Sequence, residues 1–114
     1  MLMQREEDKI LTWHPEGKKG VLMSVTQYTA ICNFILAVLR AGEVTTNDLM
    51  ERAESELSTI ISKDISWHIL VVKLDLEARG LISSITRSVP SRVQVLRLNP
   101  RALKKFNPLF LSAS

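Results

Sequence analysis

The chain has 114 residues, of which 46% are apolar and 24% charged, and its formal net charge is +3. This length and composition suit one globular domain with an apolar core, and they exclude an intrinsically disordered chain. One cysteine excludes a disulfide framework, and no apolar run reaches the ~18 residues that cross a bilayer. The N-terminal MLMQREEDKI is too charged for a signal peptide, so we expect a cytoplasmic protein.

Residues 9–24, KILTWHPEGKKGVLMS, hold two short apolar stretches around PEGKKG. Proline and glycine favour a turn there, so we expect an extended arm or a hairpin within residues 1–23. PEGKKG lacks the spacing of a phosphate-binding loop, and we interpret it as a turn.

The first two helices have recognisable ends. Ser24 and Gln27 show capping-box spacing, and Gly42 is expected to end the first helix in a left-handed conformation. After a brief extended link, Thr45 or Thr46 caps a second helix. Its inner stripe includes Leu49, Ala53 and Leu57, and its outer face is acidic, with Glu51, Glu54 and Glu56.

A third helix, capped by Asp64 or Ser66, is predicted to end at Gly80. Two segments rich in β-branched and aliphatic residues follow, at 82–87 and 92–98, on either side of the turn sequence SVPS. Asn99 and Pro100 then suit the start of a short final helix with Leu103 and Phe106 facing inward.

The order helix, link, helix, turn, helix, strand, turn, strand resembles a winged helix-turn-helix domain. KLDLEARGLI (73–82) looks like the end of its recognition helix running into the first wing strand. The resemblance implies an α+β, mainly helical fold with a three-helix core and a two-stranded wing at 24–98. The arm or hairpin (1–23) and a short C-terminal helix and tail (99–114) would complete one domain, 1–114.

The stretches HPEGKKG and W…VKLDLEARGLI are also similar to those of a family of small bacterial proteins with no assigned function. This second resemblance agrees with the fold and implies no activity, cofactor or substrate.

The winged-helix resemblance implies a regulatory protein that binds double-stranded DNA. From Arg79 onward the chain has seven lysines and arginines and no acidic residue, a charge pattern that attracts polyanions. Arg87 and Arg92 flank the wing turn, and Ser66 and Lys73 are the best candidates on the third helix. A solvated surface is the competing interpretation of all four residues.

A helical wheel of the third helix gives two apolar rows. We expect one row to face the core: Trp67, Leu70, Val71, Leu74 and Ala78. The opposite row would lie outside and is the candidate interaction surface: Ile65, Ile69, Val72 and Leu76. The N-terminal arm, the segment with Phe106 and Phe110, or a second subunit could cover it. The alternative function is therefore a protein-interaction module or homodimer without DNA binding.

Residues for catalysis or metal binding do not form a pattern. His14 and His68 lack metal-ligand spacing, and Cys32 lies in an apolar helix, where a buried inert thiol is expected. We therefore expect no enzyme, no metal and no cofactor.

Overall fold

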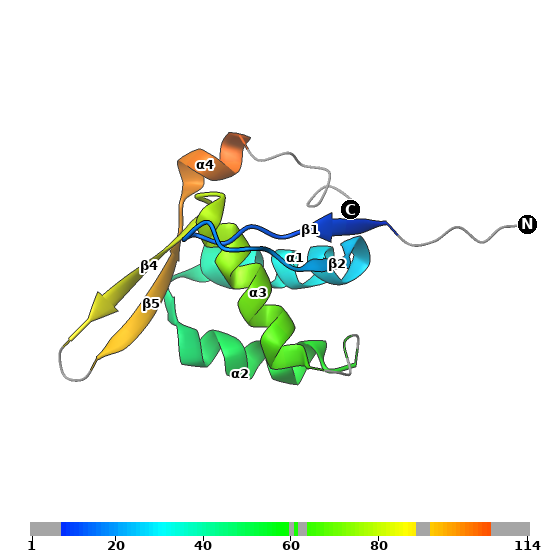
Figure 1. Cartoon of the computed structure of the whole chain (residues 1–114). Helices are drawn as coiled ribbons and strands as arrows, with labels where there is room; N and C mark the ends of the chain where they lie inside the picture. Colours follow the sequence, from blue (N-terminus) through cyan, green and yellow to red (C-terminus); the bar gives the residue numbers. More distant parts are fainter. Residues whose placement is uncertain (1–7, 60, 62–63, 89–91, 106–114) are drawn as a thin grey trace, which may run out of the picture.

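The computed structural model describes residues 8–59, 61, 64–88 and 92–105 (Figure 1). Within these residues the chain is α+β, with four helices and two small antiparallel sheets. No helix of this described part is long and apolar enough to cross a membrane.

Of the two expected forms of the N-terminal segment, arm or hairpin, the structure has the hairpin, and we use this name for residues 9–24. Strand β1 (Lys9–Leu11) pairs antiparallel with β2 (Leu22–Ser24). The ladder continues beyond the strands, because the Thr12 N–H donates to the Val21 carbonyl at 2.9 Å and its hydroxyl accepts from the Val21 N–H at 2.9 Å. A Cβ on Gly20 would lie 1.7 Å from the Thr12 carbonyl oxygen, so only glycine fits there.

Helix α1 (Val25–Ala41) begins as predicted. The Ser24 hydroxyl accepts from the Gln27 N–H at 3.0 Å, which satisfies one of the N–H groups left unpaired at a helix start. The helix ends at Gly42 as expected, but the predicted left-handed conformation is wrong. Gly42 has φ 147° and ψ 173°, an extended conformation with positive φ that directs the chain straight into a strand.

The link after α1 is itself a strand. β3 (Val44–Thr45) pairs with β5 (Val93–Leu98), and β5 also pairs with β4 (Ile82–Arg87). The predicted antiparallel strands are therefore confirmed, but the sheet has three strands in the order β3-β5-β4 rather than two. Strand β3 was not predicted, because two residues are too few to show the alternating pattern of a strand. Most of the predicted wing turn, at 89–91, lies outside the described residues.

Helix α2 (Thr46–Leu57) starts at the predicted cap, since the Thr45 hydroxyl accepts from the Asp48 N–H at 3.1 Å. Its predicted inner stripe is confirmed by the buried side chains Leu49, Ala53 and Leu57.

Helix α3 (Ile65–Ala78) ends in a Schellman motif. The Gly80 N–H donates to the Glu77 carbonyl at 3.0 Å, and the Leu81 N–H donates to the Leu76 carbonyl at 2.9 Å. Gly80 has φ 79°, the left-handed conformation that the sequence predicted. Of the two predicted caps, Asp64 occupies the cap position, but its side chain makes no capping hydrogen bond, and Ser66 lies inside the helix.

Helix α4 (Pro100–Lys105) is held to the end of α3 by Asn99. The side-chain N–H of Asn99 donates to the Gly80 carbonyl at 3.0 Å, and the side-chain oxygen of Asn99 accepts from the Ala102 N–H at 3.4 Å. The predicted cap at Asn99 is thus confirmed, whereas Phe106 and Phe110 lie outside the described residues.

The core lies where α1, α2 and α3 meet the three-stranded sheet. Its largest fully buried side chains are Tyr28, Ile31, Ile35, Leu36, Leu49, Ile61, Ile69, Val72, Asp75, Leu76, Leu81 and Leu96. They come from three helices, the sheet and the connections at Ile61 and Leu81, so the helices and the sheet form a single packed unit.

Candidate interaction surface

The two apolar rows of α3 face opposite to our prediction, except that Val71 of the predicted inner row is buried in the core as expected. Ile69, Val72 and Leu76 are fully buried in the core, whereas Trp67 and Leu70 are 48% and 40% exposed. The predicted interaction row, which also includes the half-buried Ile65, is therefore unavailable to a partner. We call the opposite row, Trp67, Leu70, Leu74 and Ala78, the outward stripe.

Polar side chains on the two flanks of α3 fix which row faces inward. On one flank Asp75 is completely buried against α1 and the hairpin. On the other flank Lys73 is 4% exposed and its ammonium lies 2.7 Å from the Glu77 carboxylate. A helical wheel does not distinguish the two apolar rows, so the long-range partners of Asp75, on the hairpin and on α1, decide between them.

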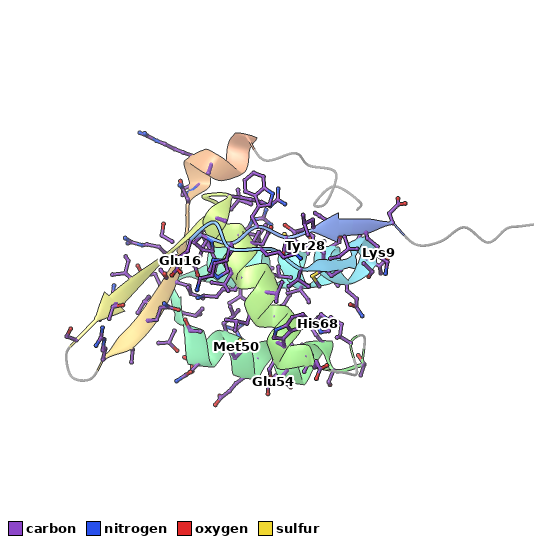
Figure 2. All side chains as sticks on the ribbon, viewed as in Figure 1. Lys9, Glu16, Tyr28, Met50, Glu54 and His68 are labelled. Carbon is purple, nitrogen blue, oxygen red and sulfur yellow. The ribbon has the colours of Figure 1, made fainter. Side chains whose placement is uncertain are left out.

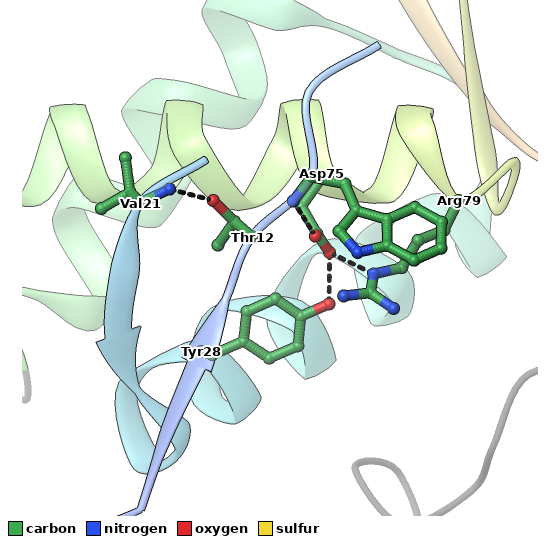
Figure 3. Close-up of polar contacts among 6 residues, drawn as sticks. Thr12, Val21, Tyr28, Asp75 and Arg79 are labelled. Atoms are coloured by element: carbon green, nitrogen blue, oxygen red, sulfur yellow. Dashed lines mark hydrogen bonds and ion pairs between the residues drawn. The ribbon is translucent and has the colours of Figure 1, made fainter. Parts of the chain in front are cut away.

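Asp75 ties three segments together (Figure 3). Its carboxylate accepts from the Trp13 backbone N–H at 2.8 Å, from the Tyr28 hydroxyl, and from the Arg79 Nε at 2.8 Å. The Arg79 guanidinium carbon also lies 4.4 Å from the centroid of the Trp13 ring, a cation–π contact. The hairpin is therefore fastened to the C-terminal half of α3 and to α1 by one buried carboxylate.

Burial and the charges in this cluster shift the pKa values of Tyr28 and Arg79. Burial, followed by the hydrogen bond and the charge of Asp75, raises the pKa of Tyr28 far above its ordinary value. Burial alone would lower the pKa of Arg79, but its hydrogen bond and ion pair with Asp75 outweigh this and raise it. Tyr28 therefore stays neutral and Arg79 charged, which leaves the buried carboxylate with a donor on each side.

The hairpin covers the C-terminal half of the outward stripe incompletely. A hollow of about 400 Å³ separates Ala78 from Leu11 and Trp13. A smaller one of about 40 Å³ lies among Trp13, Val71 and Leu74, with Lys19 beside it. The stripe therefore runs from the exposed Trp67 into a hollow edged by hairpin residues.

Exposed apolar side chains concentrate on these same two elements. Among the residues that the structure describes, the exposed large apolar side chains are Leu11, Trp13, Leu22, Trp67 and Leu70. The first three belong to the hairpin and the last two to α3, and Trp13 of the hairpin contacts Arg79 just after α3. Exposed apolar side chains on two elements that touch are candidates for a binding site.

The two predicted DNA-contact residues on α3 have partners inside the protein. The Ser66 hydroxyl donates to the Glu54 carboxylate of α2, and Lys73 forms the buried pair with Glu77. Lys73 is therefore buried against its own helix, whereas Ser66 remains exposed but is bonded to α2.

The predicted wing residues lie at the far end of the sheet. Arg87 is exposed and ion-paired with Glu43 at 3.1 Å, and Arg97 pairs with the same carboxylate at 3.0 Å. Arg92 is exposed and borders a hollow of about 370 Å³ with Thr45 and Asn47 at the start of α2. The ends of β4 and β5 keep a positive charge, but Glu43 offsets part of it.

Candidate reactive groups are dispersed. Cys32 is buried as predicted, and burial raises the pKa of its thiol to about 12, so it is almost entirely protonated near neutral pH. Within the described part of the chain, no three His, Cys, Asp or Glu side chains lie together in a way that could hold a metal ion. The sequence missed the cluster around Asp75, although the i,i+4 spacing of Asp75 and Arg79 was a signal for one of its pairs.

Comparison with known proteins gives a family but no activity. No curated protein and no solved structure matches the chain. Residues 9–93, which run from the hairpin to the start of β5, match a family described as a family of unknown function, DUF6958. This match confirms the resemblance to an uncharacterised family. The chain is a member of DUF6958.

Proposed function

We propose that the chain is a winged helix-turn-helix protein that works as a protein-interaction module through the outward stripe and the hairpin. The winged-helix assignment is supported by the element order α1-β3-α2-α3-β4-β5 and by the sheet order β3-β5-β4. In such a domain α3 occupies the position of the recognition helix. No catalytic step is part of this proposal.

The observation that carries the proposal is the chemistry of the exposed side of α3. A helix that reads DNA presents Arg, Lys, Asn or Gln to base edges, whereas this side presents Trp67 and Leu70. Glu54 of α2, which accepts a hydrogen bond from Ser66 at the start of α3, would repel phosphates. An exposed tryptophan flanked by polar groups is instead typical of the centre of a protein–protein interface.

Site-specific photo-crosslinking in the native cells tests the proposal. A benzophenone amino acid replaces Trp67, and a matched variant carries it at Arg52, which is exposed on α2. We expect a discrete crosslinked protein band from position 67 and none from position 52. Equal crosslinking at both positions, or none at position 67, would contradict the proposed function.

A second candidate function is the binding of double-stranded DNA through the wing, as expected of a transcription regulator. It is favoured by the exposed Arg87 and Arg92 at the end of β4 and the start of β5. Gel-shift affinity is measured across a range of salt concentrations for wild type, R87A/R92A and the control R52A. The double variant should lower the salt slope by up to about two if each arginine touches a phosphate. Absence of duplex binding at low salt would rule this function out.

A further inference from the structure

We infer that the larger hollow, between the hairpin and the end of α3, binds a small organic anion with a flat apolar body. The inference goes beyond the proposed interaction function, because Trp67 and Leu70, which carry that proposal, line neither hollow under the hairpin. Figure 2 shows Glu16 of the hairpin turn well away from His68, which follows Trp67. The inference follows from the size of the hollow, the way its walls are fixed and the charges around it.

The hollow has the size and the lining of a small-molecule site. Its volume of about 400 Å³ lies within the roughly 300–1,000 Å³ that is typical of ligand sites. Leu11, Trp13 and Ala78 give it apolar walls, and Trp13 keeps 54% of its surface exposed, so its ring offers a flat apolar surface. Trp13 also lines the smaller hollow, with Val71 and Leu74. The two hollows therefore share one aromatic wall.

The walls of the hollow are held in place by the protein itself. The Trp13 backbone N–H donates to Asp75 at 2.8 Å, and the Arg79 guanidinium carbon lies 4.4 Å from the centroid of the Trp13 ring. Thr12 is fastened to Val21 by two hydrogen bonds of 2.9 Å. Binding costs less conformational entropy where the walls are already ordered. The buried carboxylate of Asp75 therefore fixes the position of the aromatic wall.

The charges around the two hollows leave a positive balance. The Asp75 carboxylate is completely buried and paired with Arg79, and Lys18, which lines the larger hollow, pairs with Glu16 at 3.2 Å. These four charges cancel. Among the charged side chains that the structure describes around the hollows, Lys19, which lines the smaller one, is then the cation in excess.

A neutral donor lines the same hollows. The His14 Nδ1 accepts from the Glu16 N–H at 3.1 Å, so the neutral imidazole carries its proton on Nε2. His14 lines both hollows, as Trp13 does. An ammonium and an imidazole N–H suit a carboxylate, whereas Lys19 would repel a cationic ligand. The aromatic wall and these two groups together specify a flat apolar anion.

NMR titration of the ¹⁵N-labelled full chain with phenylacetate tests the inference. Trp13 and Trp67 are the only tryptophans, so their two indole N–H signals report the hollow and the start of α3 separately. W67F assigns the signals. We expect a saturable shift of the Trp13 signal and little change at Trp67. Phenylacetamide, which has the same shape without the charge, should bind about fivefold more weakly.

Two variants localise the site. A78F fills the hollow without removing a polar group and should weaken phenylacetate binding at least about tenfold, as expected for a steric block of about 1.4 kcal/mol or more. The matched control A37F, on the exposed side of α1, should bind like wild type. K19A should weaken phenylacetate about fivefold and phenylacetamide little. Circular dichroism checks that each variant remains folded.

Three results would overturn the inference. One is a Trp13 signal that phenylacetate at millimolar concentration leaves in place or moves no more than the Trp67 signal. Another is equal affinity for phenylacetate and phenylacetamide, and the third is wild-type affinity in a folded A78F chain. None of these results alters the crosslinking expected from position 67, so the proposed protein-interaction function stands or falls separately.

Discussion

At the scale of single residues, the buried carboxylate of Asp75 connects parts of the chain that are far apart in sequence. Trp13 is 62 residues away and Tyr28 is 47 residues away, yet both donate to it. A buried carboxylate that lost these donors would carry a large desolvation cost. The hairpin and α1 are therefore held to α3 by a group whose neighbours must remain in their present protonation states.

The titration of Tyr28 follows from this arrangement. Tyr28 is the only tyrosine, so the ultraviolet absorbance of tyrosinate reports this one group. The folded chain holds the phenolic proton above about pH 10, where the unfolded chain releases it. Stability should therefore be unaffected by this group below about pH 10 and fall above it by about 1.4 kcal/mol per pH unit.

We expect tyrosinate absorbance to rise only together with unfolding, as followed by circular dichroism across an alkaline titration. Y28F should show no such absorbance change. A tyrosinate signal with a midpoint near pH 10 in a chain that is still folded would contradict the burial of this hydroxyl.

At the scale of elements, three sides of α3 are buried against the rest of the protein, and the fourth side carries exposed apolar side chains. Its buried row packs against the core, and its flanks use Asp75 towards α1 and Lys73 with Glu77 on the other side. Only the outward stripe is left without a full cover, and the hairpin reaches only its C-terminal half.

The direction in which α3 faces can be tested with two leucines of the same helix. L76A removes a fully buried side chain and should lower the free energy of unfolding by about 2–5 kcal/mol. L70A changes a side chain that is 40% exposed and should cost less than about 1 kcal/mol in the monomer. Urea denaturation at low protein concentration measures both, and a larger cost for L70A than for L76A would show that the helix is turned the other way.

At the scale of the whole molecule, local signals predicted the elements and long-range contacts decided the surface. Ser24, Thr45 and Gly80 each end or begin a helix through a hydrogen bond to a residue a few positions away. Such local spacing is visible in the sequence, so these helix ends could be predicted. The orientation of α3 was not readable, because both apolar rows have helical spacing and the deciding partners lie on other elements. The pairing of Arg87 with Glu43 could not be predicted either, because these residues are 44 positions apart and meet only in the folded chain.

The central claim is that the outward stripe is bare in the isolated chain and covered by a protein in the cell. Hydroxyl-radical footprinting by mass spectrometry tests it directly, with dilute purified protein compared with the same protein inside its native cells. We predict that Trp67 and Leu70 are modified in the dilute protein and protected in the cell, while the half-buried Met50 of α2 reacts alike in both. Equal modification of Trp67 in both conditions, or its protection already in the dilute monomer, would contradict the account.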